Sequence, residues 1–191
     1  MPLKPLIWPE HPAWFDQNGL ALVILTLPAG TLRSDARLRA REVLRDFSKR
    51  LLDLPLAKIV LVEASNGPLL TGADRDIRVS LSYAGDKVLI GLSCGRALGV
   101  DIVQIDRIAE TRALSRLYLP QSACATVLEA APDLTDQSFA SGWAQMEACC
   151  KALSLPLAEI DEEREKAYAN CELVDCEQII GYRMAVAIIP Q

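Results

Sequence analysis

Hydrophobic residues along this chain form short continuous runs and longer stretches with helical spacing. The short runs predict β-strands, at about residues 20–27, 58–63, 78–83, 87–93, 98–103, 170–174 and 178–188. Apolar residues that recur three and four positions apart predict α-helices, at about residues 35–52, 109–118, 120–131 and 136–153. Strands and helices follow one another in a similar order in both halves of the chain, and this pattern favours an α+β fold.

Polar residues and glycines mark where these elements begin and end. The candidate N-caps of the two long helices are Ser34, Asp35, Thr135 and Asp136. Turns are expected at Gly85-Asp86 and at Asn66-Gly67-Pro68. Because no long linker separates the halves, we expect two tightly packed subdomains, at residues 1–97 and 98–191, each a small antiparallel sheet packed with a long helix.

The composition is that of a folded domain with an excess of acidic residues. Of the 191 residues, 51% are hydrophobic and 24% are charged, and the formal net charge is −5. This charge argues against a protein that binds nucleic acid through a basic face. The only histidine is His11, so a Ser-His-Asp site or a metal site built from several histidines is nearly excluded.

The sequence also lacks the features of a membrane or secreted protein. No segment approaches the roughly 20 apolar residues of a membrane span, and the proline-rich N-terminus is not typical of a signal peptide. We therefore expect a cytoplasmic protein, without membrane association, whose cysteines are reduced. None of the cysteines forms a CxxC pair, which favours small core side chains over a metal or redox site: Cys94, Cys124, Cys149, Cys150, Cys171 and Cys176.

Asp101 lies in the middle of an apolar strand, between Val100 and Ile102. A buried carboxylate is costly unless it is paired, hydrogen-bonded or bound to a cation. Because side chains alternate along a strand, Asp101 should share its face with Gly99 and Val103. On spacing alone, the simpler alternative is favoured, in which the carboxylate accepts backbone N–H bonds at a strand end.

Glu147 and Lys151 are four residues apart on the helix expected at 136–153, and Trp143 lies one turn earlier. On spacing alone, an exposed Glu–Lys pair that adds little stability is the commoner explanation. The neighbouring positions are small or apolar, however, and this allows a pair that faces a cleft instead of bulk water.

Two further groups of residues are candidates for phosphate binding. Ser82 and Tyr83 end a strand beside Ala84-Gly85, where a hydroxyl and free backbone N–H groups can hold a phosphate oxygen. An ordinary strand end before a hairpin is the simpler alternative. Arginines four residues apart form a basic stripe along the first helix, and a solvated helix face is the commoner explanation for such a stripe: Arg33, Arg37, Arg41 and Arg45.

Together these features resemble the 4′-phosphopantetheinyl transferases of the larger, surfactin-type class. The resemblance rests on the segment SLSYAGDKVLIGLSCGRALGVDI and, further along, on WAQMEACCKAL. Members of that family carry a Gly-(Val/Ile)-Asp-Ile strand after a hairpin and later a Trp-x-x-x-Glu-(Ala/Ser)-x-x-Lys helix. The similarity is good at residues 77–104 and 141–153 and fair at 33–52 and 178–188, where GYRMAVAI looks like the family's last strand.

The resemblance implies two pseudo-symmetric α+β halves with coenzyme A bound in the cleft between them. It implies a monomeric enzyme that moves the phosphopantetheine arm of coenzyme A onto a serine of an acyl or peptidyl carrier protein. The second product would be adenosine 3′,5′-bisphosphate. The attack on a pyrophosphate requires Mg²⁺ to neutralise charge.

The resemblance also assigns roles at the reacting phosphates. Asp101 and Glu147 match the family's magnesium ligands, and Lys151 matches the lysine that contacts the phosphates. The base would be Glu147 or a water bound to the metal, and the nucleophile is the serine of the carrier protein.

Coenzyme A would be held by further matching positions. Ser82 matches the serine that touches coenzyme A, and Tyr83 stands where the family usually has a histidine. One or two arginines of the basic stripe would hold the 3′-phosphate, and these are the candidates: Arg33, Arg37 and Arg41.

The chain departs from the family's pattern at several positions. Besides Tyr83, Val103 replaces a third carboxylate, Gly67 replaces a lysine and Met146 replaces a basic residue. Gln121, Ser122 and Ala123 occupy a helix segment that often carries a glutamate. These departures support an alternative function, in which a catalytically reduced relative binds coenzyme A or a carrier domain without turnover. A third interpretation is a plain α+β domain in which the motif matches are chance.

Overall fold

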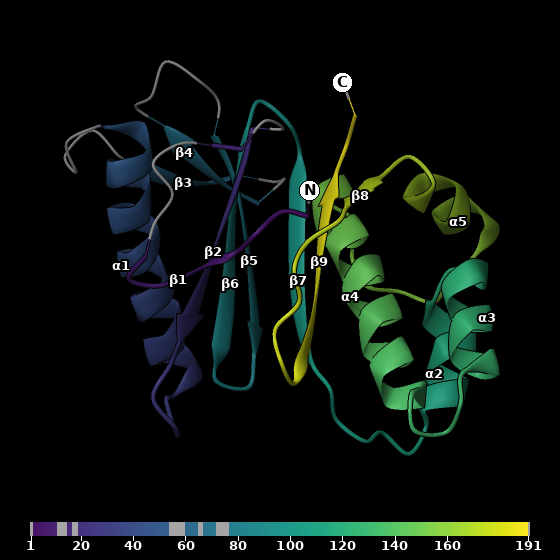
Figure 1. Ribbon diagram of the computed structural model, residues 1–191. Helices are drawn as coiled ribbons and strands as arrows, with labels where there is room; N and C mark the ends of the chain where they lie inside the picture. The colour runs from purple at the N-terminus through teal and green to yellow at the C-terminus, as the bar shows by residue number, and fades with distance from the viewer. Residues whose placement is uncertain are drawn as a thin grey trace.

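The computed structural model describes residues 2–10, 15–16, 19–53, 60–64, 67–71 and 77–190. Within these ranges the fold is α+β, as predicted (Figure 1). The elements, in chain order, are β1 (Leu6–Ile7), β2 (Leu20–Thr26), α1 (Arg33–Leu52), β3 (Val60–Ala64), β4 (Gly67–Thr71), β5 (Ile77–Ala84), β6 (Lys87–Cys94), β7 (Leu98–Gln104), α2 (Thr111–Tyr118), α3 (Gln121–Glu129), α4 (Thr135–Leu153), α5 (Glu162–Tyr168), β8 (Glu172–Val174) and β9 (Tyr182–Ile188).

The strands form two sheets that are stacked between two long helices. The larger sheet has the order β1-β2-β6-β5-β4-β3, and all its pairs are antiparallel except β1 with β2. The smaller sheet is antiparallel, with the order β7-β9-β8. Figure 1 shows the resulting layers: α1, the larger sheet, the smaller sheet and α4, with α2, α3 and α5 beyond α4.

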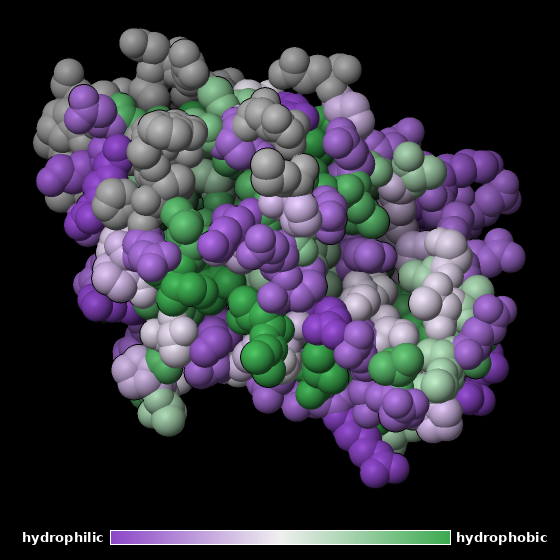
Figure 2. Space-filling view, in the orientation of Figure 1, coloured by the Kyte–Doolittle hydropathy of each residue, from purple (hydrophilic) through white to green (hydrophobic). Residues whose placement is uncertain are grey.

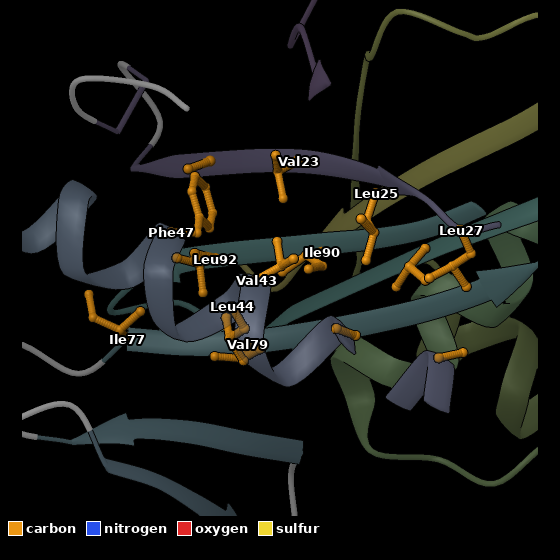
Figure 3. Close-up of a cluster of buried hydrophobic side chains, with 14 residues drawn as sticks. Val23, Leu25, Leu27, Val43, Leu44, Phe47, Ile77, Val79, Ile90 and Leu92 are labelled. Atoms are coloured by element: carbon orange, nitrogen blue, oxygen red, sulfur yellow. The ribbon is translucent and has the colours of Figure 1, made fainter. Parts of the chain in front are cut away.

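Three hydrophobic clusters fill the spaces between these layers. β2 contributes to two of them because its side chains alternate: Val23 packs with Phe47 of α1, whereas Ile24 packs with Val100 of β7. Figure 3 shows the first cluster, between α1 and the larger sheet. The third cluster joins β9 to α4 and its neighbouring helices. A strand that is buried on both faces reads as an unbroken apolar run, as β2 does in the sequence.

β5 uses the same alternation to present different chemistry on its two faces. Val79, Leu81 and Tyr83 pack in the cluster beneath α1. The intervening Ser80 and Ser82 are buried on the other side, and the Ser80 hydroxyl accepts a 2.9 Å hydrogen bond from the backbone N–H of Val100. Small polar side chains on this face therefore join the larger sheet to β7.

The close approach of α4 to β7 depends on Gly99. A Cβ atom built at this position would overlap the backbone carbonyl of Ala148 and the backbone nitrogen of Ala152. The helix also presents small buried side chains to the smaller sheet, and Ala185 and Ala187 of β9 belong to the same cluster. Small residues on both partners thus let the helix backbone lie almost directly on the strand.

Several expectations about element boundaries are wrong. Neither long helix has the side-chain N-cap predicted at Ser34, Asp35, Thr135 or Asp136. The helices begin slightly earlier, and their N-cap residues are Leu32 and Leu134, neither of which makes a side-chain capping bond. Gly67 and Pro68 do not form a turn but begin β4, and the strand expected at 178–188 starts only at Tyr182. The sequence pattern does not predict helix α5, strand β1 or strand β4.

Other expectations agree with the structure or fall outside it. The turn at Gly85-Asp86 is confirmed. His11, Asn66 and residues 58–59 lie outside the described residues. Residues up to Cys94 build the larger sheet and α1, and the chain from Leu98 builds the rest, but the domain boundary and the pseudo-symmetry of the halves stay predictions.

Surface hydropathy varies across the face of the molecule shown in Figure 2. Figure 2 shows apolar patches near the middle of the face in view and mostly hydrophilic residues toward the α5 end. Among the described residues, none of the helices combines the length and the apolar character that crossing a bilayer requires.

Candidate functional site

Side chains from three elements meet around the carboxylate of Asp101. Asp101 lies in β7 and is only 3% exposed. Its Oδ1 accepts a 2.6 Å hydrogen bond from the Ser82 hydroxyl of β5 and another 2.6 Å bond from the Nζ of Lys151 on α4. Both bonds therefore come from side chains, and the simpler alternative, a carboxylate satisfied by backbone N–H groups, is not what the described residues show.

Lys151 does not behave as one half of an exposed helix pair. Its ammonium group is 2.6 Å from Asp101 and also donates to the backbone carbonyl of Val100 at 3.1 Å. The distance to Glu147 Oε2, the partner expected from helical spacing, is much longer, at 3.9 Å. With 31% of its side chain exposed, Lys151 closes the buried carboxylate from the solvent side.

Glu147 is held in place by an aromatic neighbour. The indole N–H of Trp143 donates a 2.7 Å hydrogen bond to its Oε1. Trp143 in turn packs between Tyr118 and Phe139, with ring centroids 5.6 and 5.4 Å away. Glu147 is partly exposed, at 31% of its side chain, so it combines a fixed orientation with access to solvent.

The environment of Asp101 works against its negative charge. Burial raises the pKa of this carboxyl from 3.8 to about 6, although the nearby Lys151 opposes the shift; the charge of Glu147 adds to it. The hydrogen bonds from Lys151 and Ser82 favour the charged form but do not restore the usual pKa. The site holds two carboxylates and one ammonium, so an additional cation would be electrostatically favoured there.

The donor atoms suit a hard divalent cation. Asp101 Oδ1 takes both hydrogen bonds, and Oδ2 accepts none from the described residues. This leaves Oδ2, together with the solvent-accessible carboxylate of Glu147, as oxygen ligands. Mg²⁺ is usually held by only one or two protein carboxylates, with substrate phosphates and water completing its coordination. Groups of three or more acidic, histidine or cysteine ligands are absent from the described residues, and a Mg²⁺ site at Asp101 and Glu147 stays a prediction.

The predicted coenzyme A ligands are divided between the two faces of β5. Ser82 is buried against Asp101, whereas Tyr83 points toward α1. There the positive charges of Arg37, Arg41 and Arg33 favour the tyrosinate, but burial has the larger effect and raises the pKa of Tyr83. The arginines themselves are exposed on the helix. The structure thus brings Tyr83 together with the basic stripe and brings Ser82 together with the acidic residues, and it does not unite the two groups.

The strand end expected to offer free N–H groups is an ordinary hairpin. β5 continues past Tyr83 and stays paired with β6 as far as Ala84 and Lys87. At the tip, Asp86 accepts hydrogen bonds from Tyr182 of β9 at 2.6 Å and from Lys87 at 2.8 Å. This tip therefore links the two sheets. Of the groups predicted to bind phosphate at this strand end, the side chains of Ser82 and Tyr83 stay candidates, and the backbone N–H groups do not.

The departures from the family pattern have structural counterparts. Val103 lies on the same strand face as Asp101 and packs against the hydrophobic cluster of α4. Met146 is 1% exposed within that cluster. Neither position contributes charge, which leaves Asp101 and Glu147 as the acidic groups of the site among the described residues.

Sequence reasoning misses Ser80 and assigns no role to Trp143. Ser80 fixes the backbone of Val100, next to Asp101, and its position two residues before Ser82 on the same strand face is the signal that points to it. Trp143 is predicted one turn before Glu147, and the structure shows that its indole N–H holds that carboxylate.

An open groove of about 970 Å³ lies elsewhere, between the β7–α2 connection and the start of α4, where Arg107, Thr111 and Asp136 are among its lining residues. A cleft between the halves that would hold coenzyme A stays a prediction.

No known family model and no curated protein matches this sequence. The assignment of function therefore depends on the chemistry of the residues themselves.

Proposed function

We propose that this protein transfers the 4′-phosphopantetheine arm of coenzyme A to a serine of an acyl or peptidyl carrier protein, with Mg²⁺ as cofactor. The observation that carries the proposal is the buried Asp101 carboxylate, held by Ser82 and Lys151 and lying near Glu147. A purely structural domain gains little from burying such a group, because the desolvation of two charges offsets much of their attraction.

The proposed reaction exchanges one phosphorus–oxygen bond for another. The carrier serine oxygen attacks the phosphorus next to the pantetheine arm, and the bond from this phosphorus to the bridging oxygen breaks. Adenosine 3′,5′-bisphosphate leaves with the electron pair of that bond. The serine proton passes to Glu147 or to water. Mg²⁺, when bound, supplies positive charge against the pyrophosphate oxygens.

Each residue of the site has a part in this proposal. Asp101 and Glu147 would hold the cation through their oxygens. Ser82 fixes the orientation of Asp101, and Trp143 fixes that of Glu147. Lys151 has a flexible side chain with partial solvent access, so its ammonium can turn from Asp101 toward a phosphate oxygen when substrate and cation arrive.

The second group of residues would bind the 3′-phosphate of coenzyme A. Tyr83 is a neutral hydrogen-bond donor near Arg37 and Arg41, whose positive charges reach its hydroxyl. A 3′-phosphate carries the charge that such arginines recognise. In this proposal the pyrophosphate lies at Asp101, and the 3′-phosphate on the same ribose lies at Tyr83 and the arginines of α1.

A second candidate function follows from Val103 and Lys151. Val103 supplies an apolar side chain where a third carboxylate would strengthen cation binding, and Lys151 already neutralises Asp101. A protein that binds coenzyme A or a carrier domain without turnover would have these properties.

Intact mass spectrometry of carrier proteins distinguishes the two. The protein is mixed with coenzyme A, Mg²⁺ and a panel of apo carrier proteins. The enzyme hypothesis predicts that a carrier gains one phosphopantetheine and that chelation of Mg²⁺ prevents the gain. Calorimetric binding of coenzyme A that is independent of Mg²⁺, with no product on any carrier, would instead establish the binding protein.

Matched variants test the site itself. Glu147→Gln and Lys151→Met are expected to lower transfer at least about 100-fold, the range usual for removing a positioned catalytic group. The control is the exposed pair on α5, because Glu162 and Lys166 have the same four-residue spacing and a 2.7 Å contact. Glu162→Gln and Lys166→Met should leave transfer unchanged. Full activity in both α4 variants, with their folding verified by circular dichroism, would disprove the site assignment.

A further inference from the structure

The ammonium group of Lys151 lies between the two carboxylates of the candidate site. It is 2.6 Å from Asp101 Oδ1 and 3.9 Å from Glu147 Oε2. It also donates to the backbone carbonyl of Val100 at 3.1 Å. Three oxygens thus surround one positive centre that the protein itself supplies, and a metal ion shared by the two carboxylates would compete for the same position.

The fold holds the ammonium there through the backbone as well as through charge. β7 is an edge strand of the smaller sheet, and side chains from other elements bond both backbone groups of Val100. Its N–H donates to Ser80 Oγ at 2.9 Å, and its carbonyl accepts from Lys151. Because Gly99 lets the α4 backbone lie on β7, the helix brings Lys151 to this edge. The position of the ammonium is therefore set by the packing of α4 on β7.

Burial makes this ion pair exclude a second cation. Asp101 is only 3% exposed, and charges interact strongly where little water screens them. A divalent cation on either oxygen of this carboxylate would lie a few ångströms from the ammonium, so the two positive centres would repel each other. The side chain of Lys151 is 31% exposed, and its flexible stem can therefore turn toward solvent when another anion attracts the ammonium.

We propose that Lys151 is a resident cation that keeps Mg²⁺ off Asp101 until a diphosphate draws the ammonium away, so that the site takes a divalent metal and a diphosphate together. The identification of this diphosphate with coenzyme A rests on the proposed function, whereas the competition between ammonium and metal does not. The proposal adds an order of events to the site: the carboxylate is first neutralised internally, and metal binding awaits its phosphate partner.

The oxygens that the ammonium would leave are suitable metal ligands. Trp143 donates to Oε1 of Glu147, so Oε2 is the oxygen that faces the ammonium and stays open to another partner. Oδ1 of Asp101 would lose the lysine bond but keep that of the Ser82 hydroxyl. Carboxylate oxygens completed by phosphate oxygens and water are the usual ligands of Mg²⁺. A phosphate in turn offers the ammonium a charge-assisted hydrogen bond in place of Asp101.

This competition predicts a coupling between the two ligands. The metal alone has to displace the ammonium, and the diphosphate alone has to pull the ammonium from a buried counter-ion. Once either ligand is bound, the other no longer meets that cost, so each raises the affinity for the other by the same factor. Without the charge of Lys151, the metal should bind more tightly on its own and should gain less from the diphosphate.

Electron paramagnetic resonance of Mn²⁺ tests the competition, because it distinguishes the free ion from the bound ion and needs no carrier protein. At about pH 8 and without nucleotide, Lys151→Met should bind Mn²⁺ at least about tenfold more tightly than the wild type, since a neighbouring positive charge is removed. The matched control is Lys166→Met, which removes the same charge from an exposed pair with Glu162 and should leave the Mn²⁺ affinity unchanged. Equal affinities in all three folded proteins, or weaker binding by Lys151→Met, would overturn the proposal.

Coenzyme A provides a second measurement, which carries the test if Lys151→Met folds poorly. Its addition to the wild type should raise the Mn²⁺ affinity at least about tenfold, after correction for the Mn²⁺ that coenzyme A binds in solution. AMP, which has a single phosphate group, should not produce this increase. Where Lys151→Met is folded, its gain from coenzyme A should be smaller. An affinity that coenzyme A leaves unchanged, or that AMP raises equally, would contradict the coupling.

These outcomes are separate from those of the transfer assay. Coupled binding of Mn²⁺ and coenzyme A, together with tighter Mn²⁺ binding by Lys151→Met, supports the resident cation even if no carrier protein is modified, and in that case the enzyme proposal alone fails. Transfer to a carrier by a protein whose Lys151→Met variant gains no Mn²⁺ affinity would instead retain the enzyme and overturn the resident cation.

Discussion

Replacing Asp101 with asparagine should remove a pH dependence of stability that the native carboxylate imposes. Asp101 is 3% exposed, and burial raises its pKa from 3.8 to about 6 despite the neighbouring ammonium of Lys151. Asparagine has nearly the same shape, and its oxygen can accept the hydrogen bonds of Ser82 and Lys151, but it does not titrate. The substitution therefore isolates the charge of Asp101 from its packing.

The sign and size of the effect follow from proton linkage. The folded-state pKa lies above the unfolded value, so the folded protein binds this proton more tightly. The stability that this provides is fully present below pH 3.8 and is lost as the pH rises through about 6. The difference between the two pKa values corresponds to about 3 kcal/mol. We expect most of this loss between about pH 4 and pH 7, in the wild type but not in Asp101→Asn.

Urea denaturation of both proteins in parallel measures the effect. The free energy of unfolding is determined at pH steps across that range, and subtracting the variant from the wild type cancels the groups that titrate equally in both. The difference should move in favour of Asp101→Asn as the pH rises. A difference that stays constant with pH, or one that moves in favour of the wild type, would refute the claim that this carboxylate is held at an elevated pKa.

Three further substitutions test other parts of the structure. Gly99→Ala should lower the free energy of unfolding, measured in urea, by about 3 kcal/mol or more. The added Cβ would overlap the backbone of Ala148, which cannot move without shifting α4. A decrease in the free energy of unfolding below about 1 kcal/mol would argue against the close approach of α4 to β7. Tyr182→Phe removes the 2.6 Å hydrogen bond to Asp86 and should cost about 1 kcal/mol in the same assay, and an unchanged midpoint would show that the link between the sheets is dispensable. Val103→Glu adds a carboxylate on the face of Asp101 and should reduce the Mg²⁺ concentration needed for half-maximal transfer, whereas an increase would place position 103 away from the cation.

Local periodicity accounts for the parts of the fold that the sequence predicts well. β2, β5, β6 and β7 lie within a residue or so of their expected limits, because each is a buried run flanked by turn residues. α4 begins one residue before its expected start, since its apolar spacing is continuous. These elements are specified by residues near one another in the chain, and no knowledge of the tertiary structure is needed to find them.

The errors occur where distant residues decide the local conformation. Gly67 and Pro68 have turn propensity, yet they pair with Ala64 and Glu63 at the outer part of the larger sheet. The pairing of β4 with β5 includes Leu69 and Leu70 but not Pro68, and a proline is tolerated where it need not donate a ladder hydrogen bond. The long helices likewise contain the predicted capping residues within their first turns and have leucines at the N-cap positions, so intrinsic capping preference does not fix where they begin.

The candidate site depends both on local sequence patterns and on contacts between residues far apart in the chain. Strand alternation places Asp101 with Gly99 on one face of β7, and it places Ser82 with Ser80 on one face of β5, but it does not say which faces meet. That depends on the stacking of the two sheets, which brings Ser82 and Asp101 together across 19 residues and Lys151 to Asp101 across 50. Gly99 determines how close α4, which carries Lys151, lies to β7. Because Gly99 has no side chain, the α4 backbone lies against β7, and the ammonium of Lys151 can reach both Asp101 and the carbonyl of Val100. A larger residue at position 99 would move the helix away from the strand, so it should weaken the fold and separate Lys151 from Asp101 in the same step.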